Sequence, residues 1–97
     1  MDIKQLECFV AVAEELDFRR AGERLGISQS ALSARISALE HELGDRLFFR
    51  TTRQVSLIQA GSEFVKDSKR ILADIDSSIS NFRHTAESDL QNIRERC

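Results

Sequence analysis

The sequence predicts a mainly α-helical fold, in which three short helices and a two-stranded β-hairpin are followed by one long helix. Three observations lead to this prediction. Apolar residues recur at steps of three and four up to residue 43, which is the spacing of a helix face. Phe, Thr, Val and Ile then gather over residues 47–58, as they do in β-strands. From there on the chain has no Pro, and no Gly after Gly61, which favours an unbroken helix to about residue 92.

The first helix is expected over residues 3–15. Apolar side chains at helical spacing give it one buried face, made of Ile3, Leu6, Phe9, Val10, Ala13 and Leu16. A second, short helix is expected after Asp17, whose side-chain oxygen can accept hydrogen bonds from the free N–H groups of a first helical turn. Gly26 is expected to end this helix, because glycine readily takes the left-handed conformation found at helix ends.

A third helix is expected over residues 28–43, with Ser28 as its cap and Gly44 at its end. Its core face is predicted to consist of Leu32, Ile36, Leu39 and Leu43. Only a few residues separate it from the second helix. Two helices joined so tightly are typical of a helix-turn-helix, which we place at about residues 18–37.

The opposite face of the third helix carries small polar residues where Lys and Glu are more usual. Its members are Gln29, Ser30, Ser33, Ala34 and Ser37, and no carboxylate precedes Glu40. Short side chains let a helix approach a DNA groove, amides and hydroxyls meet base edges, and the lack of anions avoids repulsion of phosphates. This pattern predicts a recognition helix. The simpler alternative is an ordinary solvated surface.

The formal net charge of −2 hides a segregation of charges along the chain. Residues 1–17 hold one cation and five acids, whereas residues 18–58 hold seven arginines and four acids. The guanidinium group of Arg suits phosphates and base edges. The arginines therefore gather in the segment that contains the predicted helix-turn-helix and hairpin.

Residues 47–58 are expected to form the hairpin, or wing, which completes a winged helix-turn-helix domain over residues 1–58. The long helix is expected over 59–92, followed by a tail at 93–97. Its apolar stripe would be about 50 Å long, too long for so small a domain to cover. The helix is expected either to fold back on its own domain or to pair with a second copy, and we favour pairing through Phe64, Ser68, Ile71, Ile75, Ile79 and Phe82.

Other classes of function find little support in the sequence. It has no Ser/His/Asp or Cys/His arrangement, no Gly-rich phosphate loop and no paired carboxylates with a base, so we expect no enzyme. The two cysteines and two histidines lack metal-ligand spacing, and neither a metal nor a cofactor is expected; Cys8 is predicted to be buried. No apolar run is long enough to cross a membrane and no secretory signal is evident, which predicts a cytoplasmic protein.

The stretch from "LECFVAVAEE" through "LGISQSALSARISALEHELGDRLFFR" to "AG" resembles the winged helix-turn-helix domain of LysR-type transcriptional regulators. The resemblance covers residues 1 to about 61, and the long helix is similar in kind to the family's linker helix. It implies a cytoplasmic regulator that binds interrupted inverted repeats in double-stranded DNA as a homodimer or tetramer, with antiparallel linker helices. A small-molecule effector domain normally follows that helix, and we expect none within these 97 residues.

The resemblance also implies roles for single residues. Gln29, Ser30 and Ser33 would face the major groove, and Arg53 in the wing would reach the minor groove or its phosphates. Backbone contacts would come from Arg50 and from the start of the second helix. The predicted DNA-binding residues are Arg19, Arg20, Gln29, Ser30, Ser33, Ala34, Arg35, Ser37, Arg50, Thr51, Thr52 and Arg53.

Three positions depart from the family pattern. Ser30 stands where Pro is usual, Ala34 stands where Arg is common with Arg35 next to it, and Ile58 replaces a capping Thr before the long helix. A contact between Arg35 and a base is therefore less secure, because one residue turns a side chain by about 100° around a helix. The alternative function is a protein-interaction or dimerisation module without sequence-specific DNA binding, but such a module has no need to gather arginines in its helix-turn-helix and wing.

Overall fold

The computed structural model describes the backbone of residues 1–51 and 53–96 and the side chains of 1–51 and 53–91. The predicted DNA contact Thr52 and the terminal Cys97 lie outside these residues. The elements follow in the order α1 (Ile3–Glu15), α2 (Phe18–Leu25), α3 (Gln29–Leu43), β1 (Phe48–Arg50), β2 (Val55–Leu57) and α4 (Gln59–Arg96). The mainly α-helical fold with one hairpin and a long last helix is thereby confirmed.

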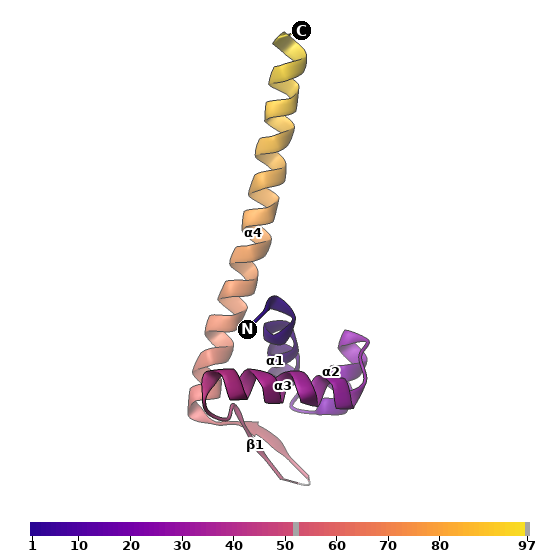
Figure 1. Cartoon of the computed structure of the whole chain (residues 1–97), viewed down its shortest axis with the longest axis vertical. Coiled ribbons are helices and arrows are strands. Elements are labelled where there is room, and N and C mark those ends of the chain that lie inside the picture. The colour runs from indigo at the N-terminus through magenta and orange to yellow at the C-terminus, as the bar shows by residue number, and fades with distance from the viewer. Residues whose placement is uncertain (52, 97) are drawn as a thin grey trace.

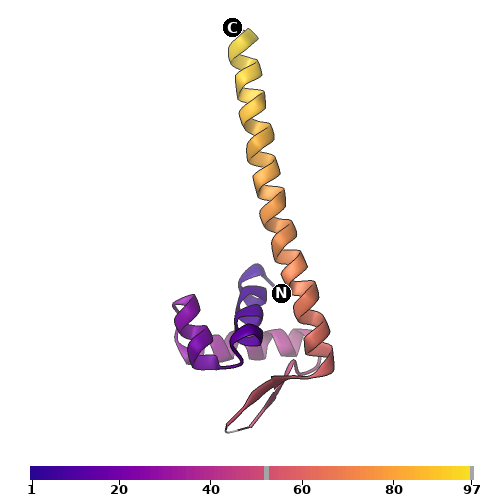
Figure 2. The ribbon, with the colours of Figure 1, turned by 180° about the vertical axis from the view of Figure 1, so that it is seen from behind.

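The three short helices and the hairpin form one body, from which α4 rises as a single long rod (Figure 1). The molecule measures 66 × 25 × 20 Å along its principal axes. The view from behind shows the hairpin below this body and α4 leading away on the other side (Figure 2). Among the described residues, none of the helices combines the length and the apolar character needed to span a membrane.

Local capping explains why the short helices begin and end where they do. Asp17 Oδ1 accepts a hydrogen bond from the Arg20 N–H at 2.9 Å, and Ser28 Oγ accepts one from the Ala31 N–H at 3.1 Å, as predicted. Gly26 and Gly44 end α2 and α3 at φ of 71° and 81°, in the left-handed region. These two capping side chains and two glycines fix the bounds of the helix-turn-helix.

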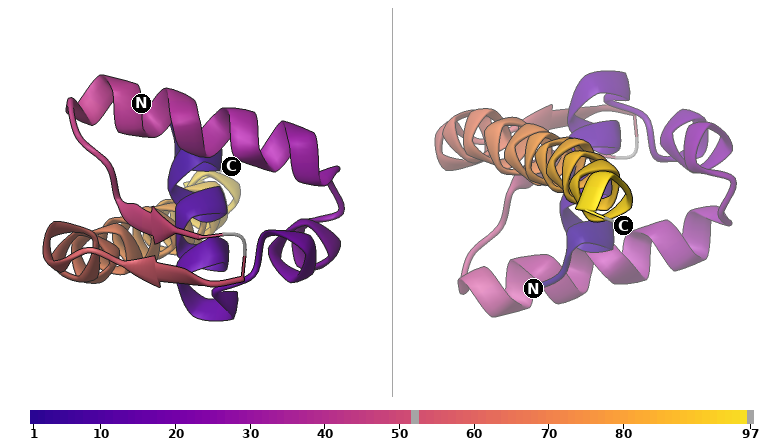
Figure 3. Two further views of the ribbon diagram at one scale, coloured as in Figure 1. Left: turned by 90° about the horizontal axis from the view of Figure 1, so that it is seen from below. Right: turned by 90° about the horizontal axis from the view of Figure 1, so that it is seen from above.

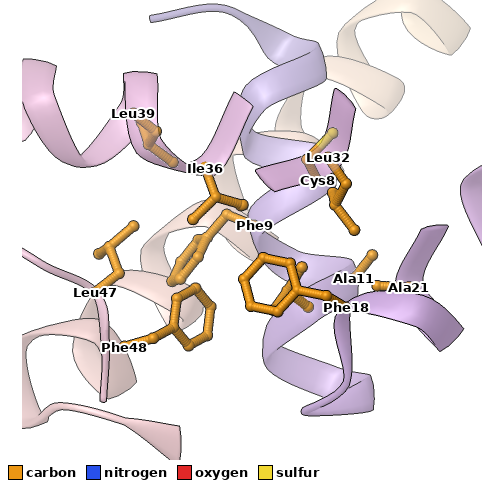
Figure 4. Packing of buried hydrophobic residues seen from close by; sticks show 11 residues of the cluster. Cys8, Phe9, Ala11, Phe18, Ala21, Leu32, Ile36, Leu39, Leu47 and Phe48 are labelled. Atoms are coloured by element: carbon orange, nitrogen blue, oxygen red, sulfur yellow. The ribbon is translucent and has the colours of Figure 1, made fainter. Parts of the chain in front are cut away.

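The first helix lies at the centre of the body and packs against α2, α3 and α4. Its core face is wider than predicted, because Ala11 and Val12 are buried as well as Phe9. Cys8 is buried as predicted (Figure 4). The predicted burial is wrong at the two ends of this face, where Ile3 and Leu16 are each 46% exposed. Neighbours on three sides cover the middle of α1, whereas its two ends project beyond them.

The core face of α3 is confirmed for Leu32, Ile36 and Leu39, all of which are fully buried. The prediction is wrong for Leu43, which is 39% exposed. It is the last residue of α3, where the chain turns at Gly44 and the helix extends past α1.

The hairpin is antiparallel, with Phe48 opposite Leu57 and Arg50 opposite Val55. Thr51 closes its turn, since its N–H donates to the Gln54 carbonyl at 2.9 Å and its Oγ1 accepts from the Gln54 N–H at 3.0 Å. The threonine hydroxyl thus organises a turn that has no glycine.

The junction between the wing and α4 is tightly packed. The Ile58 N–H donates to the Leu47 carbonyl at 3.1 Å, which places the start of α4 directly over the start of β1. A Cβ atom on Gly61 would lie only 2.3 Å from the same carbonyl oxygen. Only glycine permits this approach of the two backbones.

The apolar stripe of α4 divides into two parts. Ser68 is fully buried, and the half-buried Phe64 ring lies 5.4 Å from the Phe9 ring, so both residues pack against their own domain. Ser68 thus has no free surface for the predicted contact between copies, because α1 packs against this part of α4, whereas a contact through Phe64 stays a prediction. Ile71 and Ile75 are half-buried. Farther along, Ile79 and Phe82 are 45% and 73% exposed.

Candidate nucleic-acid interface

The predicted recognition helix and the wing lie on the same face of the molecule. Seen from below, α3 runs along one side, the wing runs along the other, and α2 closes the end between them (Figure 3, left). The long helix α4 leads away from this face (Figures 1 and 3). The face is therefore open to a large partner while α4 extends behind it.

An open groove of about 370 Å³ lies between the start of α2, the first half of α3 and the wing. Six of the predicted DNA-binding residues line it, from three separate segments of the chain: Arg19, Gln29, Ser33, Arg50, Thr51 and Arg53. Three of these residues are arginines, which give the α2 side and the wing side of the groove positive charge. Two others, Gln29 and Ser33, are one helical turn apart and add an amide and a hydroxyl from the same flank of α3.

One carboxylate also lines the groove, that of Asp17. Its oxygen accepts the Arg20 N–H at the start of α2, and this hydrogen bond holds the pKa of Asp17 below its ordinary value. The negative charge thus faces the positive end of the α2 dipole, which offsets part of its repulsion toward an anion in the groove.

Arg50 is held in place from two sides. Its Nη2 donates to Glu40 Oε1 at 3.1 Å, and its guanidinium carbon lies 4.8 Å from the centre of the Phe18 ring. The side chain is still 37% exposed and lines the groove. A guanidinium carries five N–H groups, so the bond to Glu40 leaves others for an anion.

The other predicted residues that the structure describes do not line the groove. Ser30, Ala34 and Ser37 are exposed on α3, and Arg20 is exposed on α2. Arg35 lies on the opposite flank of α3, where it lines a hollow together with Cys8 and Leu25. The structure therefore does not bring Arg35 together with the groove residues.

The hollow beside Arg35 is bounded by the thiol of Cys8, which is buried as predicted. Burial raises the pKa of this thiol above its ordinary value, and the nearby Arg35 opposes that effect in part. The thiol is therefore held in its neutral form within the core.

Sequence reasoning missed two residues that shape the groove. Phe18 supplies the ring beneath Arg50, and Glu40 anchors the same side chain from α3. Glu40 follows Ser33 by seven residues, or about two helical turns, so it lies on the same flank of α3. That spacing could have identified Glu40 from the sequence. The contact between Phe18 and Arg50 joins positions far apart in the sequence, so no local pattern indicates it.

Three comparisons place this chain among known proteins. The model of a family described as bacterial regulatory helix-turn-helix protein, lysR family, matches residues 3–62. Over 94 residues the chain is 43% identical to the uncharacterized HTH-type transcriptional regulator YnfL of Escherichia coli K12, an alignment that covers 97% of this chain and 32% of YnfL.

The fold is also similar to solved DNA complexes. A BenM_DBD/benA site 1 DNA complex matches with a TM-score of 0.85 and 36% identity, over 89% of this chain and 97% of that chain. A CbnR_DBD–DNA complex matches with a TM-score of 0.86 and 37% identity, over 89% of this chain and 99% of that chain. The chain thus spans nearly all of these two domains but only about a third of a curated relative such as YnfL.

Proposed function

Because the chain belongs to the LysR family of bacterial regulatory helix-turn-helix proteins, we propose that it binds double-stranded DNA sequence-specifically and regulates transcription rather than catalysing a reaction. It acts in the cytoplasm, where bacterial DNA lies. The recognition helix α3 enters the major groove, and the wing lies at the minor groove or along the sugar-phosphate backbone. The major groove of B-DNA is about 12 Å wide and admits one α-helix.

The observation that carries this proposal is the groove between α2, α3 and the wing. Arginines from the start of α2 and from the wing meet there beside the amide of Gln29 and the hydroxyl of Ser33 on α3. Cations at the edges supply affinity through phosphates, and the polar groups of α3 supply sequence discrimination through base edges. The similarity to domains solved with DNA supports the same reading.

We also propose that two copies pair through α4 and bind an interrupted inverted repeat. The exposed part of the stripe supports this, because Ile79, Phe82 and Leu90 are 45%, 73% and 59% exposed and lie beyond the reach of their own domain. Pairing about a two-fold axis would bury the same patch of α4 on both copies. It would also place two recognition helices at a fixed spacing, which is how paired half-sites are read. An antiparallel pair of α4 helices keeps the two domains apart.

Selection of binding sites from a random pool of duplexes tests both proposals together. We expect an enriched site with two-fold symmetry, and an affinity that falls steeply as the salt concentration rises. No enrichment and no salt-dependent binding to random duplex DNA would instead identify a protein-interaction module. An enriched single half-site without symmetry would retain DNA binding and refute the paired arrangement.

A further inference from the structure

Glu40 makes two hydrogen bonds that join the recognition helix to the wing. Its Oε2 accepts from the Leu47 N–H at 2.8 Å, and its Oε1 accepts from Arg50 Nη2 at 3.1 Å. Within the described part of the chain, these are the side-chain hydrogen bonds between α3 and the segment from Leu47 through β2. The Glu40 side chain is only 15% exposed. It is therefore an internal link and not part of the solvated helix surface.

The second of these bonds determines where a cation stands in the groove. Arg50 lies between the Glu40 carboxylate and the Phe18 ring, so its guanidinium is fixed by an ion pair on one side and a ring face on the other. The Glu40–Arg50 pair spans from α3 to β1, and the contact with Phe18 extends it to the first residue of α2. Loss of the carboxylate would free a long side chain that has several rotatable bonds.

We propose that Glu40 is a positioning residue for DNA binding, which acts by holding the Arg50 guanidinium at the groove where a phosphate lies in the complex. This rests on the proposed function, since it presumes that the groove takes DNA. A fixed cation loses less conformational entropy on binding than a mobile one, so the link raises affinity even though it adds a negative charge to the DNA-binding domain.

Electrostatics alone predicts that loss of the Glu40 carboxylate strengthens DNA binding. Removing a carboxylate about 10 Å from phosphates in water should tighten binding by about twofold. If Glu40 acts through Arg50, Glu40→Gln should instead weaken binding to the selected site by about tenfold. Glutamine preserves the size of the side chain and an acceptor for the Leu47 N–H, but it removes the ion pair with Arg50.

Glu42→Gln is the matched control, because it removes the same charge two residues along α3. Glu42 is exposed and pairs with the amino group of Met1, away from the groove. This variant is expected to bind as the unchanged chain does or slightly more tightly. Thermal unfolding of each variant, followed by circular dichroism, sets a temperature at which all of them are folded, and binding is measured there.

Glu40→Asp is the second variant, because it keeps the charge but is one methylene too short to reach both partners. We expect it to weaken binding as well, which a charge effect cannot explain. In an Arg50→Ala background neither Glu40 variant should weaken binding further, since the partner through which Glu40 acts is gone. Glu40→Gln should then show only the small gain expected from the lost charge. If Glu40→Gln fails to fold, Glu40→Asp in both backgrounds supplies the same comparison.

The outcomes are distinct. Weaker binding by the Glu40 variants that disappears in the Arg50→Ala background supports the proposal. Equal or tighter binding by Glu40→Gln, or a loss that persists without Arg50, overturns it. An unchanged chain that binds no DNA at all refutes the proposed function.

Discussion

The pairing of two copies through α4 makes a direct prediction for Phe82. Its ring is 73% exposed in the single chain and lies near the middle of the exposed stripe. Phe82→Ala should therefore leave the fold of one chain intact while it weakens the association of two.

The size of the effect follows from the exposed fraction of the ring. Complete burial of a large apolar side chain contributes about 2 kcal/mol. With 73% of Phe82 still exposed, pairing gains about 1.5 kcal/mol from each ring, or about 3 kcal/mol from the two rings of a dimer. Since about 1.4 kcal/mol is a factor of ten, Phe82→Ala should raise the Kd for dimerisation by about 100-fold.

Sedimentation equilibrium over a wide range of protein concentrations measures this Kd. His84→Ala is the matched control, because His84 is also exposed but lies about 200° around the helix from Phe82. It should leave the Kd unchanged. A Phe82→Ala chain that dimerises as well as the control, or an unchanged chain that is monomeric at every concentration, would refute pairing through this stripe.

Four further predictions concern the groove and the fold. Gln29→Ala should weaken binding to the selected site by about 1–3 kcal/mol and hardly change binding to random duplex, as competition titrations would show. An equal loss on both would mean that Gln29 contacts the sugar-phosphate backbone of the DNA. Arg53→Ala should weaken binding to all sequences and lower the magnitude of the slope of log affinity against log salt by about one. An unchanged slope would mean that the wing makes no phosphate contact through Arg53. Gly61→Ala should lower the free energy of unfolding in urea by about 1–3 kcal/mol, because the new Cβ would lie 2.3 Å from a carbonyl oxygen; unchanged stability would mean that the junction relaxes freely. The hydrogen bond from Arg24 holds the pKa of Glu14 below its ordinary value, so it stabilises the fold at neutral pH, and this contribution is lost as the pH falls through the folded pKa. Glu14→Gln should therefore make the free energy of unfolding fall less steeply as the solution is acidified. An unchanged acid dependence would contradict this.

The parts of the fold that sequence predicted well are those set by neighbours along the chain. Asp17 and Ser28 satisfy N–H groups three residues away, and Gly26 and Gly44 end their helices through their own backbone. Such signals need no knowledge of the tertiary structure. Gln29 and Ser33 were found for a related reason, because residue type and helical spacing already separate a small polar flank of α3 from its core face. The arginines of the groove were named from the resemblance to the family and not from spacing.

What sequence missed is one unusual backbone conformation and the burial set by contacts between distant positions. Leu16 takes φ of 52° at the end of α1, a conformation that its side chain gives no reason to expect. Phe64 and Ser68 continue the same stripe as Phe82, and only the packing of α1 decides that Ser68 is buried and Phe64 half-buried. By contrast, the position of Arg35 on the other flank of α3 follows from the sequence, because one residue of offset turns a side chain by about 100° around a helix.

Four aromatic rings run in sequence through the body of the molecule. Phe64 of α4 lies 5.4 Å from Phe9, Phe9 lies 5.6 Å from Phe48, and Phe48 lies 6.2 Å from Phe18 at the start of α2. Three of these rings meet in the core (Figure 4). Close-packed rings leave little free volume and resist compression. A tilt at the base of the long rod would therefore push the Phe64 ring against Phe9, and through this row it would press on the rings of the hairpin and the second helix.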